Sequence, residues 1–247
     1  MAGLTRAQID KVEFKDFAMG PGPLRPRDAA TLILLDRSQA EPHVLMGRRS
    51  SKHAFMPGRL VFPGGRTDPD DGRVKVATDL HPDIAARLNA GRGRPLSATR
   101  ARAIVLSAVR ETYEEAGLLI GNKGDYSTAK ASWEAFAEHG VVPDLASLRI
   151  IARAITPPGR VRRFDTYFVA AWRDQVAVSL PEGGPTQELE ELVWLPIAQA
   201  MEQEVPAITR SVLGDLARRL ADDPDLTPAH PIPFYRMRYG KFHRDLI

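Results

Sequence analysis

The chain has 247 residues, and 43% of them are hydrophobic, so it is long enough to bury the core of one elaborated domain. Its 34 basic residues nearly balance its 31 acidic residues, which excludes the strong positive field that attracts nucleic acids. The absence of cysteine excludes disulfide bonds and thiol catalysis.

The first part of the chain predicts a surface lead followed by a β-hairpin. Residues 1–28 carry charges through their start and are rich in proline and glycine towards their end, so we expect neither a signal peptide nor a packed element there. Residues 29–35 and 43–47 are strand-like and are joined by a polar turn. Because no apolar run reaches the length of a membrane span, we expect a cytoplasmic protein without a membrane partner. The sequence shows no helix-turn-helix or basic DNA-reading segment, so we expect no nucleic-acid partner.

The later segments alternate between helical and strand-like patterns. A helix is expected over residues 101–116, and Gly117 stands where glycine commonly ends helices. The elements expected after it are a helix over 129–139, strands over 149–155, 166–172 and 189–195, and helices over 196–204 and 206–220. This mixed order indicates an α/β fold.

Three carboxylates and an arginine occupy two turns of the first expected helix, in the sequence Arg-Glu-Thr-Tyr-Glu-Glu-Ala-Gly-Leu from position 110 to 118. A helix places residues three and four apart on one face, so Glu111, Glu114 and Glu115 are neighbours. Like charges at this spacing repel each other, and a divalent cation would gather them. The alternative is a solvated acidic face with a weak surface pair between Arg110 and Glu114.

A glycine turn further upstream favours the metal site over the solvated face. Residues 59–61 form a short strand-like segment, and the turn Pro63-Gly64-Gly65 follows, where glycine allows close approach of the backbone to a ligand. Together the two motifs resemble the signature of the Nudix hydrolases, which runs Gly, five residues, Glu, seven residues, then Arg-Glu-hydrophobic-x-Glu-Glu-x-Gly-hydrophobic. The second half matches with one departure, Thr112 at the hydrophobic position.

The first half of the signature is interrupted. Counting from Gly65, the glutamate position falls on Asp71, whereas Arg110 lies 45 residues after Gly65 in place of the fourteen of the signature, which leaves 31 extra residues. We place this insert at about residues 70–100 and interpret it as a surface excursion beside the site, with one short apolar patch at residues 84–88. Asp71 is a candidate substitute for the missing glutamate of the signature. The alternatives are a role outside the direct metal ligands, or no role in the site.

The segments before this signature, which is called the Nudix box, narrow the resemblance to one branch of the superfamily. Residues 44–50 and 55–65 resemble those of coenzyme A diphosphatases of the superfamily, and the branch typified by the mammalian peroxisomal acyl-CoA diphosphatase also carries a long insert in its box. The resemblance implies an α/β/α sandwich with a mixed central sheet over residues 29–222, with an extra helical part at its C-terminal end. Residues 223–247 are then a tail, whose aromatic side chains pack on the domain or on a partner subunit in a homodimer.

The resemblance also implies roles for the box residues. Glu111, Glu114 and Glu115 would bind Mg²⁺ or Mn²⁺ together with the carbonyl oxygen of Gly64. Arg110 would orient Glu111 by a charge-assisted hydrogen bond. Because the glutamate that accepts the proton of the attacking water differs between family members, Glu111 and Glu115 both stay candidates for catalysis.

Residues outside the box supply the remaining candidates. A further carboxylate from outside the box often completes such sites, and we favour Glu188 and Glu191 over Glu190. The alternative is that these residues only form a solvated acidic segment leading into the expected strand. Arginine suits phosphate because its guanidinium donates several hydrogen bonds. The substrate-binding candidates, each weighed against ordinary solvated surface, are Arg49, Arg59, Gly65, Arg66 and Arg163. His53 lies in the segment of coenzyme A type and is weighed against a structural role.

The function implied by the resemblance is hydrolysis of a small nucleotide substrate. The leading hypothesis is a metal-dependent diphosphatase that cleaves coenzyme A or acyl-CoA to 3′,5′-ADP and (acyl-)phosphopantetheine. One alternative is a diphosphatase for another nucleoside diphosphate derivative, such as ADP-ribose, NADH or a damaged nucleotide. The other is a non-catalytic Nudix domain that senses a nucleotide, which the intact arginine and three glutamates argue against.

Overall fold

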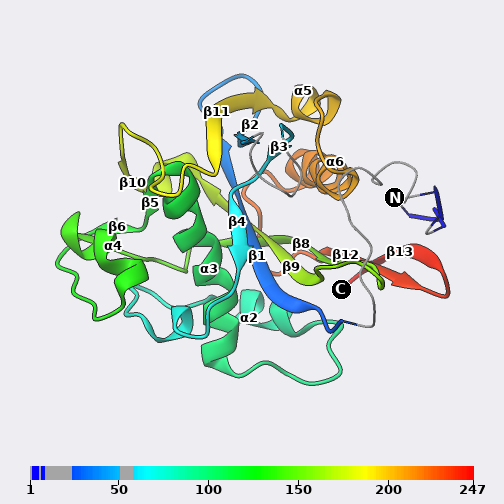
Figure 1. Ribbon diagram of the computed structural model, residues 1–247, viewed down its shortest axis with the longest axis horizontal. Helices are drawn as coiled ribbons and strands as arrows, with labels where there is room; N and C mark the ends of the chain where they lie inside the picture. The colour runs from blue at the N-terminus through cyan, green and yellow to red at the C-terminus, as the bar shows by residue number, and fades with distance from the viewer. Residues whose placement is uncertain (1, 6, 9–23, 51–57) are drawn as a thin grey trace.

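The computed structural model describes residues 2–5, 7–8, 24–50 and 58–247. Its centre is a nine-stranded mixed sheet with the strand order β11-β2-β1-β9-β8-β12-β13, in which β3 also pairs with β2 and β4 with β1 (Figure 1). The strands of this sheet are β1 (Arg27–Asp36), β2 (His43–Arg49), β3 (Leu60–Val61), β4 (Gly64–Arg66), β8 (Arg149–Ile155), β9 (Phe164–Trp172), β11 (Leu189–Pro196), β12 (Pro233–Arg238) and β13 (Lys241–Leu246).

Strand β1 is an interior strand of the sheet, and its two faces are covered by different helices. Leu32 and Leu34 belong to a buried cluster that includes residues of α3 (Ala98–Ala116). Ile33 and Leu35 point to the opposite face, where they pack in a second cluster with residues of α6 (Ala207–Asp222). Such burial on both faces explains the near-continuous apolar run of β1. The fold is therefore the expected α/β/α sandwich, with α5 (Ile197–Glu202) beside α6 (Figure 1).

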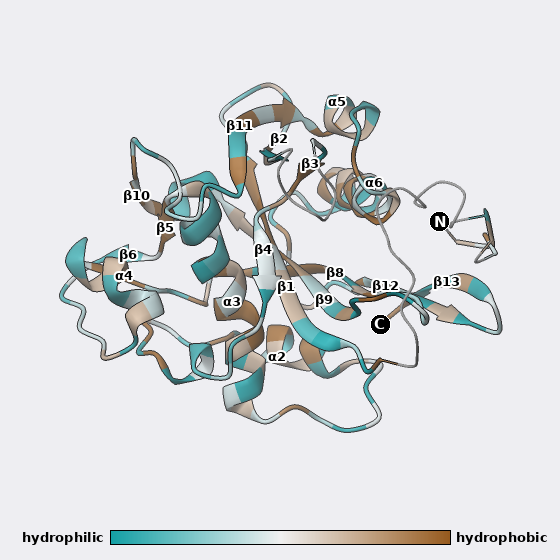
Figure 2. Ribbon diagram, viewed as in Figure 1, coloured by the Kyte–Doolittle hydropathy of each residue, from teal (hydrophilic) through white to brown (hydrophobic). Residues whose placement is uncertain are grey.

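Helix α3 has a buried first half and a polar second half. Ser97 caps its start by accepting a hydrogen bond from the backbone N–H of Arg100, and Gly117 ends it with a positive φ of 69°. Figure 2 shows the change from hydrophobic residues in the middle of the helix to hydrophilic residues towards β5 (Leu118–Ile120). The first half thus anchors the helix in the core, and the second half is left to carry the glutamates.

The insert packs against the sheet, which corrects its interpretation as a surface excursion. It contains the 3₁₀ turn η1 (Asp71–Arg73) and helix α2 (Pro82–Asn89), whose Ile84 and Leu88 are buried in the same cluster as α3. After α2, Arg92 donates hydrogen bonds to Asp28 at 3.3 Å and to Asp165 at 3.2 Å. The insert is therefore tied to the starts of both β1 and β9.

Two expectations about element boundaries need correction. The helix expected over residues 129–139 is a 3₁₀ turn, η2 (Ala131–Trp133), followed by the short helix α4 (Glu134–Glu138), because the backbone of Trp133 leaves the helical region with φ −118° and ψ 4°. The lead expected over residues 1–28 ends earlier, since β1 begins at Arg27. Residues 223–247 contribute the strands β12 and β13 to the sheet, with Phe234 and Tyr235 buried.

Two smaller strand pairings and a connecting turn complete the fold. Strand β10 (Val176–Ser179) pairs with β5, and β6 (Asn122–Lys123) pairs with β7 (Val141–Val142). The short turn η3 (Arg173–Gln175) connects β9 to β10. Within the described part of the chain, the helices are all too short or too polar to cross a lipid bilayer.

Candidate functional site

The glycine turn and the second half of α3 lie against each other. The backbone N–H of Gly64 donates a hydrogen bond to Oε2 of Glu115 at 3.1 Å. A Cβ atom on Gly65 would lie 2.4 Å from Cδ of Glu111, and one on Gly64 would lie 2.5 Å from Cα of Thr31. Glycine is therefore needed at both positions, at Gly64 to let the turn reach β1 and at Gly65 to leave room for the Glu111 carboxylate.

Arg110 is the hub of the site, because its buried guanidinium holds four groups at once. It donates two hydrogen bonds to Asp71, at 2.9 and 3.2 Å, and one each to Glu111 at 2.9 Å and Glu114 at 2.8 Å. A further bond goes to the backbone carbonyl of Arg66 at 3.1 Å. Burial opposes the charge on Arg110, but the bonds to Asp71 and the neighbouring carboxylates outweigh it and raise the pKa of Arg110. The guanidinium thus fixes the orientation of two of the three glutamates.

Asp71 is a buried counterion of Arg110. Its side chain is 1% exposed, and it also accepts a hydrogen bond from the indole N–H of Trp133 at 3.1 Å. Asp71 stands at the position that the signature gives to its first glutamate, so the insert leaves this contact in place. Trp133 is a site-supporting residue that sequence reasoning missed, since nothing in a buried tryptophan 62 positions away signals its partner.

The carboxylates of the buried Glu115 and the partly buried Glu111 repel each other. Burial, with the charges of Glu111 and Glu188, raises the pKa of Glu115 to about 8 against the opposing hydrogen bond from Gly64 and the charge of Arg49. Burial also raises the pKa of Glu111, and the charge of Glu114 adds to it, although Arg110 acts in the opposite direction. A divalent cation beside these two carboxylates would relieve this repulsion.

The carboxylate oxygens of this cluster that accept no hydrogen bond are ligands of the type that hard cations prefer. In Glu111, Glu114 and Glu115, one carboxylate oxygen takes a hydrogen bond and the other takes none from the part of the chain that the structure describes. Among those described residues, no three acidic or histidine side chains already converge into a closed metal cage. The donor chemistry therefore suits Mg²⁺ or Mn²⁺, with Glu114 held towards Arg110.

The acidic residues just before and within the start of β11 have different partners. Glu188 accepts a hydrogen bond from Arg49 at 2.9 Å, and its charge reaches Glu115. Glu191 pairs with Arg48 at 2.9 Å and has a half-exposed side chain. The pairing of β11 with β2 shifts register between Leu189 and Glu191, so simple strand alternation does not hold here. The structure thus brings Glu188, rather than Glu191, towards the buried glutamates.

Known proteins resemble the chain in both sequence and fold. No family model matches the sequence. The chain is 24% identical over 190 residues to "Putative nudix hydrolase 7" of Caenorhabditis elegans, an alignment that covers 72% of this chain and 54% of that protein. It is 25% identical over 234 residues to acyl-coenzyme A diphosphatase NUDT19 of Gallus gallus, covering 74% of this chain and 58% of that protein. The chain therefore spans little more than half the length of these two relatives.

A solved structure agrees with these relatives. The crystal structure of a Nudix hydrolase from Alicyclobacillus acidocaldarius matches with a TM-score of 0.60 and 25% identity, over 78% of this chain and 92% of that one. The chain has the fold of the Nudix hydrolases and resembles them in sequence. Its Nudix box consists of the glycine turn in β4 and the second half of α3, separated by the insert that carries α2.

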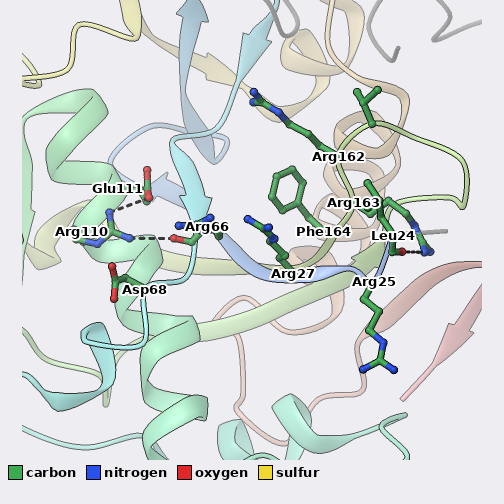
Figure 3. Close-up of a pocket in the computed structure, with 11 residues that line it drawn as sticks. Leu24, Arg25, Arg27, Arg66, Asp68, Arg110, Glu111, Arg162, Arg163 and Phe164 are labelled. Carbon is green, nitrogen blue, oxygen red and sulfur yellow. Dashed lines mark hydrogen bonds and ion pairs between the residues drawn. The ribbon is translucent and has the colours of Figure 1, made fainter. Parts of the chain in front are cut away.

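A cleft of about 700 Å³ opens beside the Nudix box. Glu111 and Arg110 form part of its wall, and strands β1, β4 and β9 supply other residues (Figure 3). The further lining residues are Leu24, Arg25, Arg27, Arg66, Asp68, Val161, Arg162, Arg163 and Phe164. Any ligand whose diphosphate reaches Glu111 would therefore extend into a strongly cationic space.

The expected substrate-binding residues divide into two groups. Arg66 and Arg163 line the cleft, and Gly65 lies directly under the Glu111 carboxylate. Arg49 pairs with Glu188, and Arg59 donates to the backbone carbonyl of Val205 at 3.4 Å, between α5 and α6. His53 and the segment 51–57 lie outside the described residues.

Sequence reasoning missed Arg25, Arg27 and Phe164 as lining residues. Arg27 and Phe164 are opposite each other in the parallel pairing of β1 and β9, which brings distant parts of the chain together at the cleft. The only sequence signal nearby is the group of arginines before β9, which includes Arg162. A parallel register of this kind is not readable from one sequence.

Proposed function

We propose that this Nudix protein hydrolyses the diphosphate bond of coenzyme A or acyl-CoA and releases 3′,5′-ADP and (acyl-)phosphopantetheine. The observation that carries the proposal is the placement of two glutamates, the buried Glu115 and the partly buried Glu111, against a glycine turn at the wall of an arginine-lined cleft. The relative named acyl-coenzyme A diphosphatase supports the choice of substrate. The box motif, its insert and the preceding segment resemble the same branch.

The metal-binding residues in this proposal are Glu111, Glu114 and Glu115, with the carbonyl oxygen of Gly64 and with Glu188 as a further donor. A bound Mg²⁺ or Mn²⁺ would offset phosphate charge and lower the pKa of a bound water. The chain itself does the positioning. Arg110 holds the carboxylates of Glu111 and Glu114 at 2.9 and 2.8 Å, and the N–H of Gly64 holds Glu115.

Glu111 is the residue best placed to accept the proton from the attacking water. Its carboxylate lines the cleft, and its raised pKa brings its proton affinity closer to neutral pH. In the reaction, the water oxygen forms a bond to one phosphorus while the bridging P–O bond breaks, and the bridging oxygen leaves on the other phosphate. Arginines of the cleft would bind the phosphate oxygens through charge-assisted hydrogen bonds.

A panel of substrates tests the proposed function. The protein is incubated with Mg²⁺ and, separately, coenzyme A, acetyl-CoA, ADP-ribose and NADH, and the product masses are measured. We expect the two coenzyme A compounds to be cleaved fastest, with 3′,5′-ADP as a common product. Faster cleavage of ADP-ribose or NADH would overturn the substrate, and binding without cleavage of any compound would support a nucleotide sensor.

Metal binding should release a proton at neutral pH. With its pKa raised to about 8, Glu115 is mostly protonated at pH 7 in the metal-free protein and must lose its proton to bind a cation. The affinity for Mg²⁺ should therefore rise from pH 6 to about pH 8 and level off above it. Calorimetric titrations at pH 7 in two buffers of different ionisation heat measure the release. Equal heats in both buffers would contradict the assignment of Glu115 as a ligand.

A further inference from the structure

The cleft contains more positive charge than its own acidic residues can offset. Besides Arg110, which is occupied by Asp71 and the glutamates, five arginines line it: Arg25, Arg27, Arg66, Arg162 and Arg163. Within residues 24–50 and 58–247, none of these five forms an ion pair with an acidic side chain. Asp68 and Glu111 are the acidic residues of the lining, and Glu111 is held by Arg110.

Many arginines elsewhere in the described chain are paired with a carboxylate, so five arginines without such a partner in one cleft form a distinct group. Arg48, Arg92, Arg153 and Arg244 all lie within hydrogen-bond distance of a carboxylate. Unpaired guanidinium groups side by side in a concave site repel one another, and an anionic ligand relieves that repulsion. The cleft therefore fits a ligand with several negative charges.

A diphosphate alone does not account for this charge. The diphosphate of a doubly esterified substrate carries two negative charges, fewer than the five arginines of the lining that have no acidic partner among the described residues. Some of these arginines then have no counterpart unless the ligand carries another anionic group. A phosphate monoester is the matching chemistry, because it carries between one and two negative charges at neutral pH and accepts bidentate hydrogen bonds from guanidinium groups.

An aromatic ring lies among these arginines. Phe164 is half-buried at the start of β9, and Arg27 is its direct neighbour across the β1–β9 pairing. Figure 3 shows Arg27, Arg66 and Arg162 around the ring, whereas Arg25 points away from it. A flat ring face surrounded by cations is suited to a nucleobase carried on a phosphorylated ribose, since bases stack on aromatic side chains.

The insert fixes the starts of β1 and β9, the backbone segments that carry Arg27 and Phe164. Arg92 bonds to Asp28 and Asp165, which directly follow Arg27 and Phe164 in sequence. Arg153 binds the same Asp165 through two further hydrogen bonds of 2.8 and 2.7 Å. The ends of β1 and β9 are thus fixed from behind, so that the arginine and the ring keep their positions at the cleft.

We propose that this cleft binds the nucleoside end of the substrate, and that Arg27, Arg66 and Arg162 bind a phosphate monoester on the ribose, separate from the diphosphate that is cut. Phe164 stacks on the base. The inference rests on the proposed function for its substrate and adds the residues that select it. The ligand class is a nucleoside that carries both a diphosphate and a further phosphate.

A pair of substrates that differ only in this phosphate tests the proposal. We expect kcat/KM to be roughly ten- to a hundredfold higher for coenzyme A than for dephospho-coenzyme A, the range that charge-assisted hydrogen bonds supply. The double substitution Arg27→Met and Arg162→Met should bring this ratio close to one. Arg238→Met is the matched control, because Arg238 is exposed on the β12–β13 hairpin and should leave the ratio unchanged. Equal use of both compounds by the unmodified protein would overturn the proposal.

A binding measurement separates this inference from the proposed function. Calorimetry compares 3′,5′-ADP with AMP, which lacks the second phosphate, in the unmodified protein and in the Arg27→Met, Arg162→Met variant. Tighter binding of 3′,5′-ADP that is lost in the variant would support the arginine site even if neither coenzyme A compound were cleaved. Equal affinity for the two nucleotides, or no binding of either, would overturn the site whatever the protein hydrolyses.

Discussion

Replacing Glu115 with glutamine is expected to lower kcat by about two to four orders of magnitude, the range typical for loss of one essential catalytic group. Glu115 is 4% exposed and bonds to the backbone of Gly64, so it shapes the turn and also supplies charge to the proposed metal site. Glutamine keeps the size of the side chain and an oxygen acceptor for Gly64. The loss therefore reports the missing charge.

The same substitution should not destabilise the metal-free protein. The pKa of Glu115 is raised in the fold, so its ionisation opposes folding increasingly as the pH rises from the ordinary carboxyl range to about 8. Glutamine removes this penalty, so without metal the Tm of the variant should exceed that of the unmodified protein, by less at pH 6 than at pH 9. Glu202→Gln, at an exposed position in α5, serves as the control for activity. Near-normal turnover by Glu115→Gln would contradict the site.

Replacing Asp71 with alanine should cost about 3–5 kcal/mol of the free energy of unfolding, because it leaves a buried guanidinium without its main counterion. Arg110 has a side chain that is 8% exposed, and Asp71 takes two of its hydrogen bonds. The indole N–H of Trp133 loses its acceptor as well. Urea denaturation followed by tryptophan fluorescence measures the loss.

Two further variants make this prediction specific. Asp71→Asn keeps an acceptor for Trp133 but not the charge, so it should be less destabilised than Asp71→Ala while still losing activity through a displaced Arg110. Asp70→Ala removes the adjacent carboxylate, which forms surface pairs with Lys130 and Arg73, and should change stability much less. Equal stability losses for Asp70→Ala and Asp71→Ala would contradict the role of the buried pair.

Much of the site could be predicted because its signals are local. The helix of the box was placed from its periodicity and from Gly117, and it begins at Ala98, three residues before the predicted start. The meeting of Gly64 and Gly65 with Glu111 and Glu115 follows from a motif whose two halves are read separately. The α/β/α sandwich followed from the same resemblance and is confirmed by the sheet and its two helical layers.

The parts that could not be predicted depend on long-range pairing. The bond between Asp71 and Arg110 closes across the insert, and only the fold shows that the insert leaves it intact. Arg27 and Phe164 meet through parallel strands, a register that hydrophobic pattern does not determine. Strand β12 follows a proline-rich segment and pairs with β8, so its partner lies far away in sequence.

The most direct test of the central claim is to follow the diphosphate of coenzyme A in water labelled with ¹⁸O. The unmodified protein with Mg²⁺ should form 3′,5′-ADP and phosphopantetheine, with one ¹⁸O atom in the newly formed phosphate of one product, and Glu115→Gln should form neither at a comparable rate. Intact coenzyme A after prolonged incubation, or products formed equally well by the variant, would contradict hydrolysis at this glutamate cluster.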